Sequence, residues 1–179
     1  MKRTLASVSS IAEKEATLSF ESDLTLLLPR LRRFARALTH DAADADDLTQ
    51  IAVERALVAR ASFVAGTRMD SWMYRIMRNA WIDTTRSRAR AAQTFVAEEA
   101  GAMVGDDGDR ALEARAELGR VGRAMATLPD EQREAVALVL VEGLAYKEAA
   151  AVLDIPIGTL TSRLVRGRTA LIEKLGKAA

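Results

Sequence analysis

Arginine and hydroxyl side chains gather in ten consecutive residues close to the C-terminus. Three arginines, two threonines and one serine occur there: Thr159, Thr161, Ser162, Arg163, Arg166 and Arg168. Guanidinium groups bind phosphates and guanine edges, and hydroxyls bond to donors or acceptors on any base. Carried on one face of a helix, these side chains would bind duplex DNA in the major groove. An ordinary solvated helix surface is the alternative interpretation.

The spacing of nearby apolar residues predicts the helices that position this cluster. Three leucines lie four and seven residues apart and so share one helix face: Leu160, Leu164 and Leu171. A short helix with an apolar face precedes them. Asp154 follows it, and aspartate tolerates a left-handed turn. Pro156 suits the first turn of the next helix, where its missing N–H costs nothing. Residues 128–175 are therefore predicted to form a helix-turn-helix.

A second cluster combines aromatic rings with arginines. Residues 72–83 hold two tryptophans, one tyrosine and two arginines, and such surfaces stack on single-stranded nucleic acid. Trp72 lies four residues before Ile76, so part of this stripe must be core, and Trp72 is expected to pack inside. Four side chains spread over other faces and are expected to be available: Tyr74, Arg75, Arg78 and Asn79. The segment ends in a basic stretch, residues 86–90.

The overall pattern predicts an all-α protein of two small helical domains joined by a flexible linker. In the first domain, helices are expected over 24–38, 44–60 and 72–90. Pro29 should lie at a start or a kink of the first helix, and acidic residues at the start of the second should offset the helix dipole. In the second, a helix from Leu128-Pro129 should run to Glu142 and end at Gly143. The boundaries predicted are a tail at 1–23 (mobile, or a short helix that docks on a partner), a first domain at 24–92, an acidic linker at 93–110 and a second domain at 111–179.

Charge is distributed unevenly along the chain. The net charge is +1, but residues 24–95 contain 12 arginines against 7 acidic residues, and the spacer at 96–127 reverses this with 4 arginines against 7. Two basic modules separated by an acidic spacer suit a nucleic-acid binder whose phosphate contacts are local.

Several classes of protein are disfavoured by composition. There is no cysteine, so disulfides and thiolate metal sites are excluded and a reducing compartment fits best. The single histidine, His40, cannot build a zinc site or a catalytic triad. Asp46 and Asp47 are adjacent on a helix, diverge, and cannot flank one substrate. No P-loop, nucleophile elbow, signal peptide or membrane-length apolar run is present. The sequence predicts a cytoplasmic protein that is not an enzyme, needs no cofactor and does not insert into membranes.

The order of these motifs resembles bacterial RNA polymerase sigma factors. An acid-led Asp-Asp-Leu-Thr-Gln helix is followed by a Trp-Met-Tyr-Arg-Ile-Met-Arg-Asn helix, a linker and a Leu-Pro-Asp-Glu-Gln-Arg-Glu helix-turn-helix. The two-domain form, matching over about residues 24–175, resembles the extracytoplasmic-function (ECF) group of the sigma-70 family. One departure is the tail of the tryptophan helix, residues 84–90, which is less basic than is common in that family.

The resemblance implies roles for particular residues and partners. The acid-led helix would bind core RNA polymerase at the β′ clamp through Asp46, Asp47, Leu48 and Gln50. The protein would make a further contact with the β flap of the polymerase. The loop and the tryptophan helix would hold the melted downstream promoter element through Phe63, Tyr74, Arg75, Arg78, Asn79, Asp83 and Arg86. The helix at 159–168 would read the upstream element as duplex promoter DNA. An anti-sigma factor wedged between the domains would regulate a stress response.

Two other functions remain open on the sequence alone. A sigma-like decoy would keep the fold and sequester an anti-sigma factor without initiating transcription, although the retained Arg163, Arg166 and Asn79 argue against it. A helix-turn-helix repressor would use its first domain to sense or dimerise, which leaves the tryptophan helix and its arginines unexplained.

Overall fold

The computed structural model describes the backbone of residues 2–92 and 109–176, and the side chains of 19–91 and 117–176. Every regular element in these parts is helical, which confirms the predicted all-α class. Most of the predicted linker, 93–108 of 93–110, lies outside the described residues. Within the described residues, no helix is long and apolar enough to cross a membrane.

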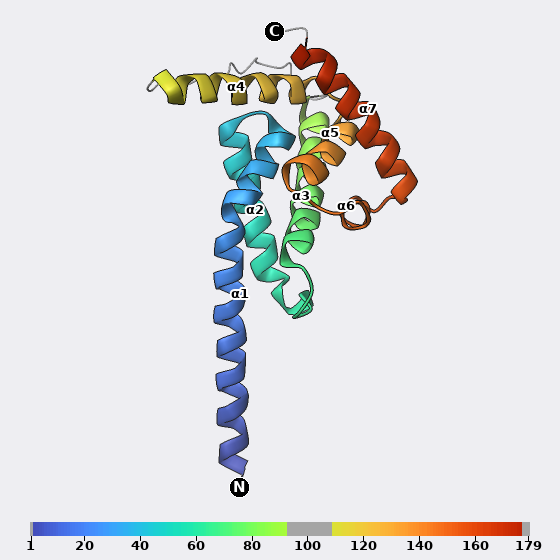
Figure 1. The fold of residues 1–179 in the computed structure, drawn as a ribbon. Coiled ribbons are helices and arrows are strands. Elements are labelled where there is room, and N and C mark those ends of the chain that lie inside the picture. Colours follow the sequence, from blue (N-terminus) through green and yellow to red (C-terminus); the bar gives the residue numbers. More distant parts are fainter. Residues whose placement is uncertain (1, 93–108, 177–179) are drawn as a thin grey trace.

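The N-terminal domain is a bundle of three helices (Figure 1), with a short 3₁₀ turn in the loop before the third: α1 (Lys2–Thr39), α2 (Ala42–Val58), η1 (Arg60–Ser62) and α3 (Met69–Ala92). Each of the three long helices packs on the other two. The bundle core is fully buried at its centre, where Phe34 of α1 lies edge-on to Tyr74 of α3 with ring centroids 5.0 Å apart.

Helix α1 differs from the prediction at its N-terminal end. The segment expected as a mobile tail or a short separate helix forms the first half of α1. The N-terminal turns of this helix project away from the rest of the structure (Figure 1), whereas Phe20 is buried against the bundle. Pro29 lies inside this helix and neither begins nor ends it. A proline removes one backbone hydrogen bond, but Leu24 and Leu31 are buried on either side of it. Packing against α2 and α3 therefore holds the helix across that position.

The C-terminal domain contains the predicted helix-turn-helix. Its elements are α4 (Asp109–Ala126), α5 (Asp130–Val136), a π-helical turn η2 (Ala137–Val141), α6 (Tyr146–Leu153) and α7 (Ile157–Gly176). Two predicted turns are confirmed by left-handed residues, Gly143 with φ +73° and Asp154 with φ +53°. Helix α7 crosses α5 so closely that a Cβ on Gly167 would lie 2.8 Å from Cγ2 of Val136.

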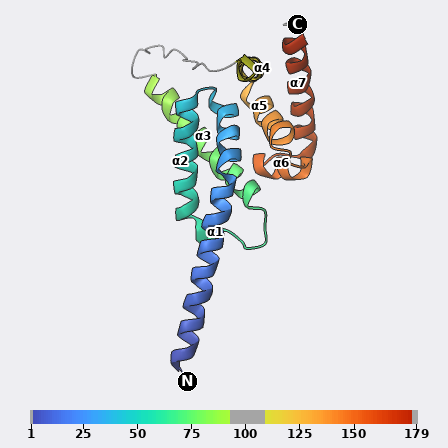
Figure 2. The same ribbon diagram turned by 60° about the vertical axis from the view of Figure 1, so that its left-hand side comes forward.

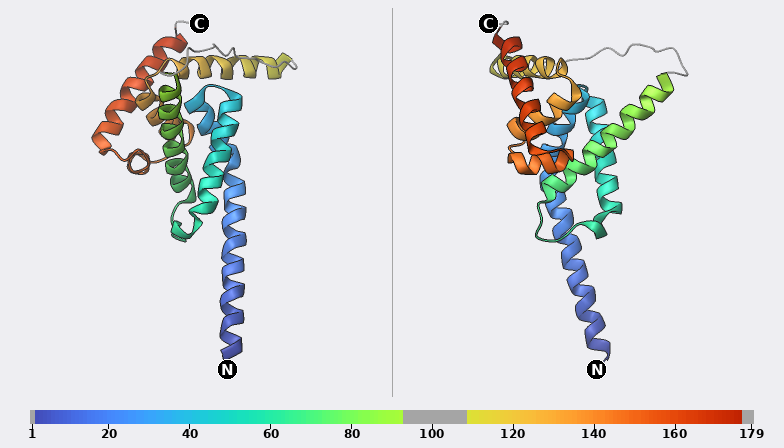
Figure 3. Two further views of the ribbon diagram at one scale, coloured as in Figure 1. Left: turned by 180° about the vertical axis from the view of Figure 1, so that it is seen from behind. Right: turned by 90° about the vertical axis from the view of Figure 1, so that its right-hand side faces the viewer.

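The two domains lie against each other along α3 (Figure 2). Helix α3 contacts α6, and α1 contacts α4, α5 and η2. Seen from behind, α3 lies between α2 and the C-terminal domain (Figure 3). The three-helix bundle and the helix-turn-helix therefore share an interface in this structure.

Candidate nucleic-acid interface

Helix α7 presents the predicted arginine and hydroxyl side chains on its outer face. Leu160 and Leu164 are buried against the domain core, and the opposite face is exposed at Thr161, Ser162, Arg166 and Arg168, with Thr159 half-buried. The hydroxyls of Thr161 and Ser162 donate to backbone carbonyls of their own helix, 2.9 Å away in both cases. Their oxygens can therefore act as acceptors, and Arg166 and Arg168 as the cationic donors of this face.

Arg163 differs from the other arginines of α7. Its side chain is only 16% exposed and forms an ion pair of 2.9 Å with Glu131 of α5. The guanidinium lies beside the exposed outer face of α7 but is held by a carboxylate of its own domain. It would have to exchange that partner in order to bind a phosphate.

One face of α3 is exposed and polar. Asn79, Asp83 and Arg86 lie three and four residues apart on it and are solvent-accessible. Asp83 accepts a hydrogen bond of 2.8 Å from Arg55 of α2, which ties this face to the neighbouring helix. Asn79 has both a donor and an acceptor and no partner within the described part of the chain. An amide of this kind can bond to the edge of an unstacked base.

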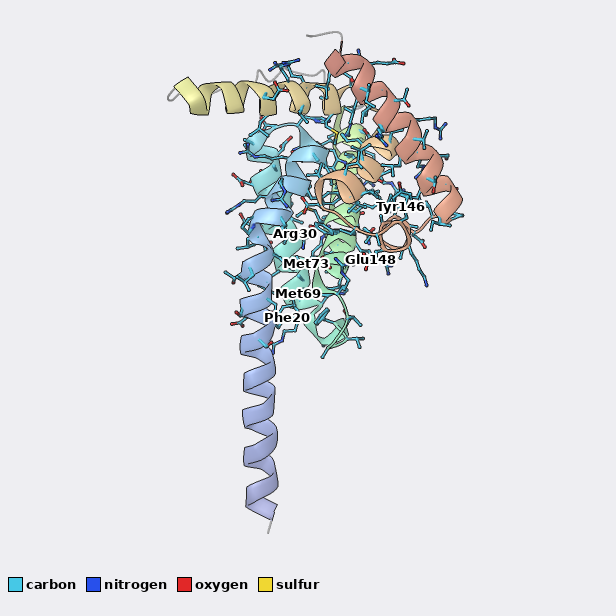
Figure 4. All side chains as sticks on the ribbon, in the orientation of Figure 1. Phe20, Arg30, Met69, Met73, Tyr146 and Glu148 are labelled. Atoms are coloured by element: carbon cyan, nitrogen blue, oxygen red, sulfur yellow. The ribbon has the colours of Figure 1, made fainter. Side chains whose placement is uncertain are left out.

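Phe63 follows η1 and lies in an aromatic cluster with Phe20 and Trp72. Its ring centroid is 5.3 Å from that of Trp72 and 5.8 Å from that of Phe20, and Phe20 and Trp72 are 6.0 Å apart. Such tilted and edge-on contacts between rings are favourable beyond the area that they bury. Trp72 is half-buried, as expected. Phe20 of α1 packs against Phe63 in the loop before α3. Figure 4 labels Phe20 on α1 and Met69 at the start of α3, near this loop.

Tyr74 is not available, contrary to the prediction. Its side chain is fully buried between α1 and α3, and its hydroxyl donates to Glu142 of the C-terminal domain at 2.6 Å. Burial raises the pKa of the Tyr74 hydroxyl far above its usual value. Periodicity alone gave no sign of this contact, because the partner is 68 residues away in the sequence.

Arg75 and Arg78 also face the C-terminal domain. Nη2 of Arg75 donates to the carbonyl oxygen of Ala151 at 2.6 Å. Nε of Arg78 donates to Glu134 at 3.1 Å, and burial raises the pKa of the Glu134 carboxyl. Of the predicted downstream-element residues on α3, the structure leaves Asn79, Asp83 and Arg86 exposed. It buries Tyr74, half-buries Arg78, and leaves Arg75 exposed but bonded to the C-terminal domain.

The acid-led helix α2 exposes a polar face. Asp41 caps it by accepting from the backbone N–H of Asp44 at 2.9 Å, and the Arg88 guanidinium holds the pKa of the Asp44 carboxyl below its usual value. Asp46, Asp47 and Gln50 are exposed. Leu48 is not: it is 3% exposed and packs in the bundle core. Leu48 was expected at the polymerase-binding surface, but its spacing puts it on the inner face of α2.

Sequence reasoning missed Glu142, Arg30 and Arg33. Glu142 was predicted only as the end of a helix, and Arg30 and Arg33 only as part of the helix expected over 24–38. In the structure the Glu142 carboxylate lies between them, with its side chain 0% exposed. An acidic residue directly before a helix-ending glycine carries no local signal of burial.

Together these features define a class of protein: an all-helical chain with a three-helix bundle and a helix-turn-helix, each with an exposed face of polar and charged side chains. Matches to known families agree with this class. Residues 24–91 match the model of sigma-70 region 2, and residues 118–171 match that of sigma-70 region 4.

Curated relatives and solved structures identify the family. The ECF RNA polymerase sigma factor EcfG of Rhodopseudomonas palustris is 34% identical over 153 residues, which cover 86% of this chain and 83% of the relative. The ECF sigma factor SigC of Mycobacterium tuberculosis is 38% identical over 78% of this chain and 74% of its own. The sigma factor RpoE of Bartonella quintana, solved with the anti-sigma factor NepR, superposes with a TM-score of 0.76 at 32% identity, covering 88% of this chain and 97% of that one.

The chain belongs to the ECF sigma factors of the sigma-70 family. It is a transcription initiation factor of a non-catalytic family, with regions 2 and 4 both present. CnrH, solved with the cytosolic domain of CnrY, shares the fold at a TM-score of 0.68 and 24% identity, covering 91% of each chain.

Proposed function

We propose that this sigma factor opens promoters with the exposed face of α3 and the Phe63 loop, and reads the upstream element with α7. The observation that carries this division is the pair of separate exposed surfaces. One has the amide of Asn79 two helical turns beyond Trp72 of the aromatic cluster, and the other has arginines and hydroxyls on a groove-sized helix. Melting needs a site for an unstacked base, whereas duplex reading needs a helix that fits the major groove.

Core RNA polymerase is the proposed partner of helix α2. Asp46, Asp47 and Gln50 form an exposed polar face with two carboxylates. The β′ clamp is the contact that the resemblance to sigma factors implies for this helix. The β flap would contact the C-terminal domain. This role also supports a cytoplasmic location, where core polymerase is found.

An anti-sigma factor is the proposed regulatory partner. The Bartonella quintana relative is solved with NepR, and a cleft of about 440 Å³ opens here between α3 and helices α5 to α7, with Trp81 and Ile82 on one wall. Ile82→Asp should abolish co-purification of a small co-expressed anti-sigma protein. Val58→Asp, on the exposed side of α2, should retain it. Equal recovery by both variants would argue against the cleft as the binding site.

Transcription by core polymerase on a pool of genomic promoter fragments tests the proposed function. Specific transcripts should appear with the wild type and fade with Asn79→Ala and with Arg166→Ala. Arg36→Ala, an exposed arginine on the polar side of α1, should leave them unchanged and serves as the control. Polymerase binding without transcripts would favour the decoy, and no polymerase binding would favour the repressor.

A further inference from the structure

The loop before α3 is held against the bundle by one side chain. Residues 60–68 are all described, and among them only Phe63 is not exposed. The backbone N–H of Phe63 and the hydroxyls of Ser62 and Thr67 donate to carbonyl oxygens three residues earlier, at 3.1, 2.7 and 2.6 Å. These hydrogen bonds shape the loop locally. The packing of Phe63 is therefore what holds the middle of the loop in place.

Phe20 of α1 is one of two rings on which Phe63 packs. Its ring lies edge-on to Phe63 at 5.8 Å and 62°, and edge-on to Trp72 at 6.0 Å and 75°. Phe63 and Trp72 are 5.3 Å apart, so the three rings form a closed triangle. Figure 4 labels Phe20 on α1, beside the start of α3. Removal of the Phe20 ring would leave Phe63 with one of its two ring contacts.

Phe20 belongs to a segment whose role the sequence left open. The match to sigma-70 region 2 begins at residue 24, and residues 1–23 were predicted to be a tail. Phe20 precedes Leu24 by four residues, so the two side chains share one face of α1. Both are buried, at 7% and 5% exposure. The core-facing side of α1 thus continues past the start of region 2 and ends at the loop.

We propose that Phe20 is a positioning residue for the unstacked promoter base, acting through Phe63. This proposal rests on the proposed function of the Phe63 loop. Because Phe20 is 7% exposed, the rings and helices around it keep a base from reaching it. Its contribution is to fix Phe63 and the loop in one conformation before the strand arrives. The part of α1 that precedes region 2 is then part of the base-binding site.

The size of the effect follows from the two ring contacts. A loop that must become ordered on binding lowers the affinity, whereas a loop already ordered in the free protein does not. Edge-on ring pairs are favourable beyond the area that they bury, so loss of both Phe20 contacts should weaken capture of the base about 5- to 10-fold. Duplex reading by α7 does not involve this loop and should be unchanged.

Hydrogen exchange of the free full-length chain tests the order of the loop. Phe20→Ala should speed up exchange of the amides of residues 60–68. Leu31→Ala is the matched control, because Leu31 is a fully buried residue of the same helix about three turns further along. It also removes a large apolar side chain from the bundle core, but it should leave exchange of the loop at the wild-type rate.

A thermodynamic cycle tests the effect on the base. The probe is a fluorescent single strand carrying the downstream element of a promoter recovered from the transcription pool, bound by core polymerase with this protein. Matched probes lack one base at a time. At the position that the loop holds, the missing base should weaken binding of the wild type and have little further effect on Phe20→Ala. Such non-additivity at one position indicates coupling through the loop.

A merely structural role of Phe20 gives a different result. Loss of folded protein would weaken binding by the same factor for every probe, and Leu31→Ala should show this additive pattern. Phe20→Leu retains an apolar side chain but no ring, and serves if Phe20→Ala folds poorly. It should show the same coupled position, with a loss of about 3-fold.

Two results would overturn the proposal. One is wild-type exchange of the loop in both Phe20→Ala and Phe20→Leu. The other is additivity at every probe position in both variants. Failure of the proposed function would overturn it as well and is distinguishable, because the wild type would then support no specific transcription although exchange of the loop still responds to Phe20→Ala.

Discussion

Gly167 is expected to be the least replaceable glycine of α7. It lies where α7 crosses α5, and a Cβ built there would stand 2.8 Å from Cγ2 of Val136 and 3.3 Å from both Cβ and the carbonyl oxygen of Gln132. The Val136 methyl can move by rotation of its side chain. The carbonyl of Gln132 belongs to the α5 backbone, so Gly167→Ala must push the two helices apart.

The magnitude follows from two opposing effects. Overpacking of a closed core costs about 1–3 kcal/mol, whereas alanine is favoured over glycine within a helix by about 1 kcal/mol. The free energy of unfolding of Gly167→Ala should therefore fall by up to about 2 kcal/mol. For a chain of this length a loss of about 2 kcal/mol lowers the midpoint of thermal unfolding by about 4–8 °C.

Thermal and urea unfolding followed by circular dichroism measures this change, with Gly122→Ala as the matched control. Gly122 lies within α4, and a Cβ placed on it would meet no heavy atom of a neighbouring element within 4 Å. Only the helix preference then acts, so stability should rise by about 0.5–1 kcal/mol. Gly167→Ala with stability equal to or above that of the wild type would refute the close-approach argument.

Three other perturbations have definite expected outcomes. Burial raises the pKa of the Tyr74 hydroxyl. In a Tyr146→Phe background, absorbance at 295 nm should therefore show no tyrosinate near pH 10, and should show it only when the chain unfolds at higher pH. Reversible ionisation of Tyr74 near pH 10 in the folded chain would contradict the buried contact. Burial alone would raise the pKa of Asp70, but hydrogen bonds from Arg68 and a backbone N–H hold that pKa below its usual value. The ionised Asp70 thus stabilises the fold above about pH 4 and loses this effect as the pH falls. At pH 7 the free energy of unfolding of Asp70→Asn should be about 1–3 kcal/mol below that of the wild type, and urea unfolding should show this difference shrinking below about pH 4. A difference that does not change with pH would show that the charge of Asp70 is not its source. Phe20→Ala should lower the free energy of unfolding by about 3 kcal/mol and reduce promoter opening, while binding to duplex DNA persists. Transcription by this variant should return on a template whose downstream element is already melted. Failure to recover on that template would contradict a role of the aromatic cluster in promoter opening.

Local sequence signals predicted the elements and the turns of this fold well. The leucine spacing of α7, the left-handed Asp154 and the helix-ending Gly143 all act within a few residues. These features depend on backbone preferences and on helix periodicity, which can be read from a short window. Two exposed faces of the candidate interface, at Asn79 and at Arg166, were accessible to the same reasoning.

The inter-domain contacts could not be predicted in this way. Tyr74 and Leu48 were expected at the surface, but both are buried because a helix of a three-helix bundle has neighbours on more than one side. Glu142 pairs with Arg30 and Arg33, which are 112 and 109 residues away. Only the arrangement of the two domains brings these charges together, and no spacing rule records it.

Permanganate footprinting of a promoter recovered from the transcription pool tests the central claim, that this chain opens promoters for core polymerase. Thymines of the downstream element should become reactive only when core polymerase and this protein are both present. Asn79→Ala should abolish that reactivity at every protein concentration, whereas Arg166→Ala should recover it when more protein is added. Opening by core polymerase alone, or equal opening by the wild type and Asn79→Ala, would contradict the account.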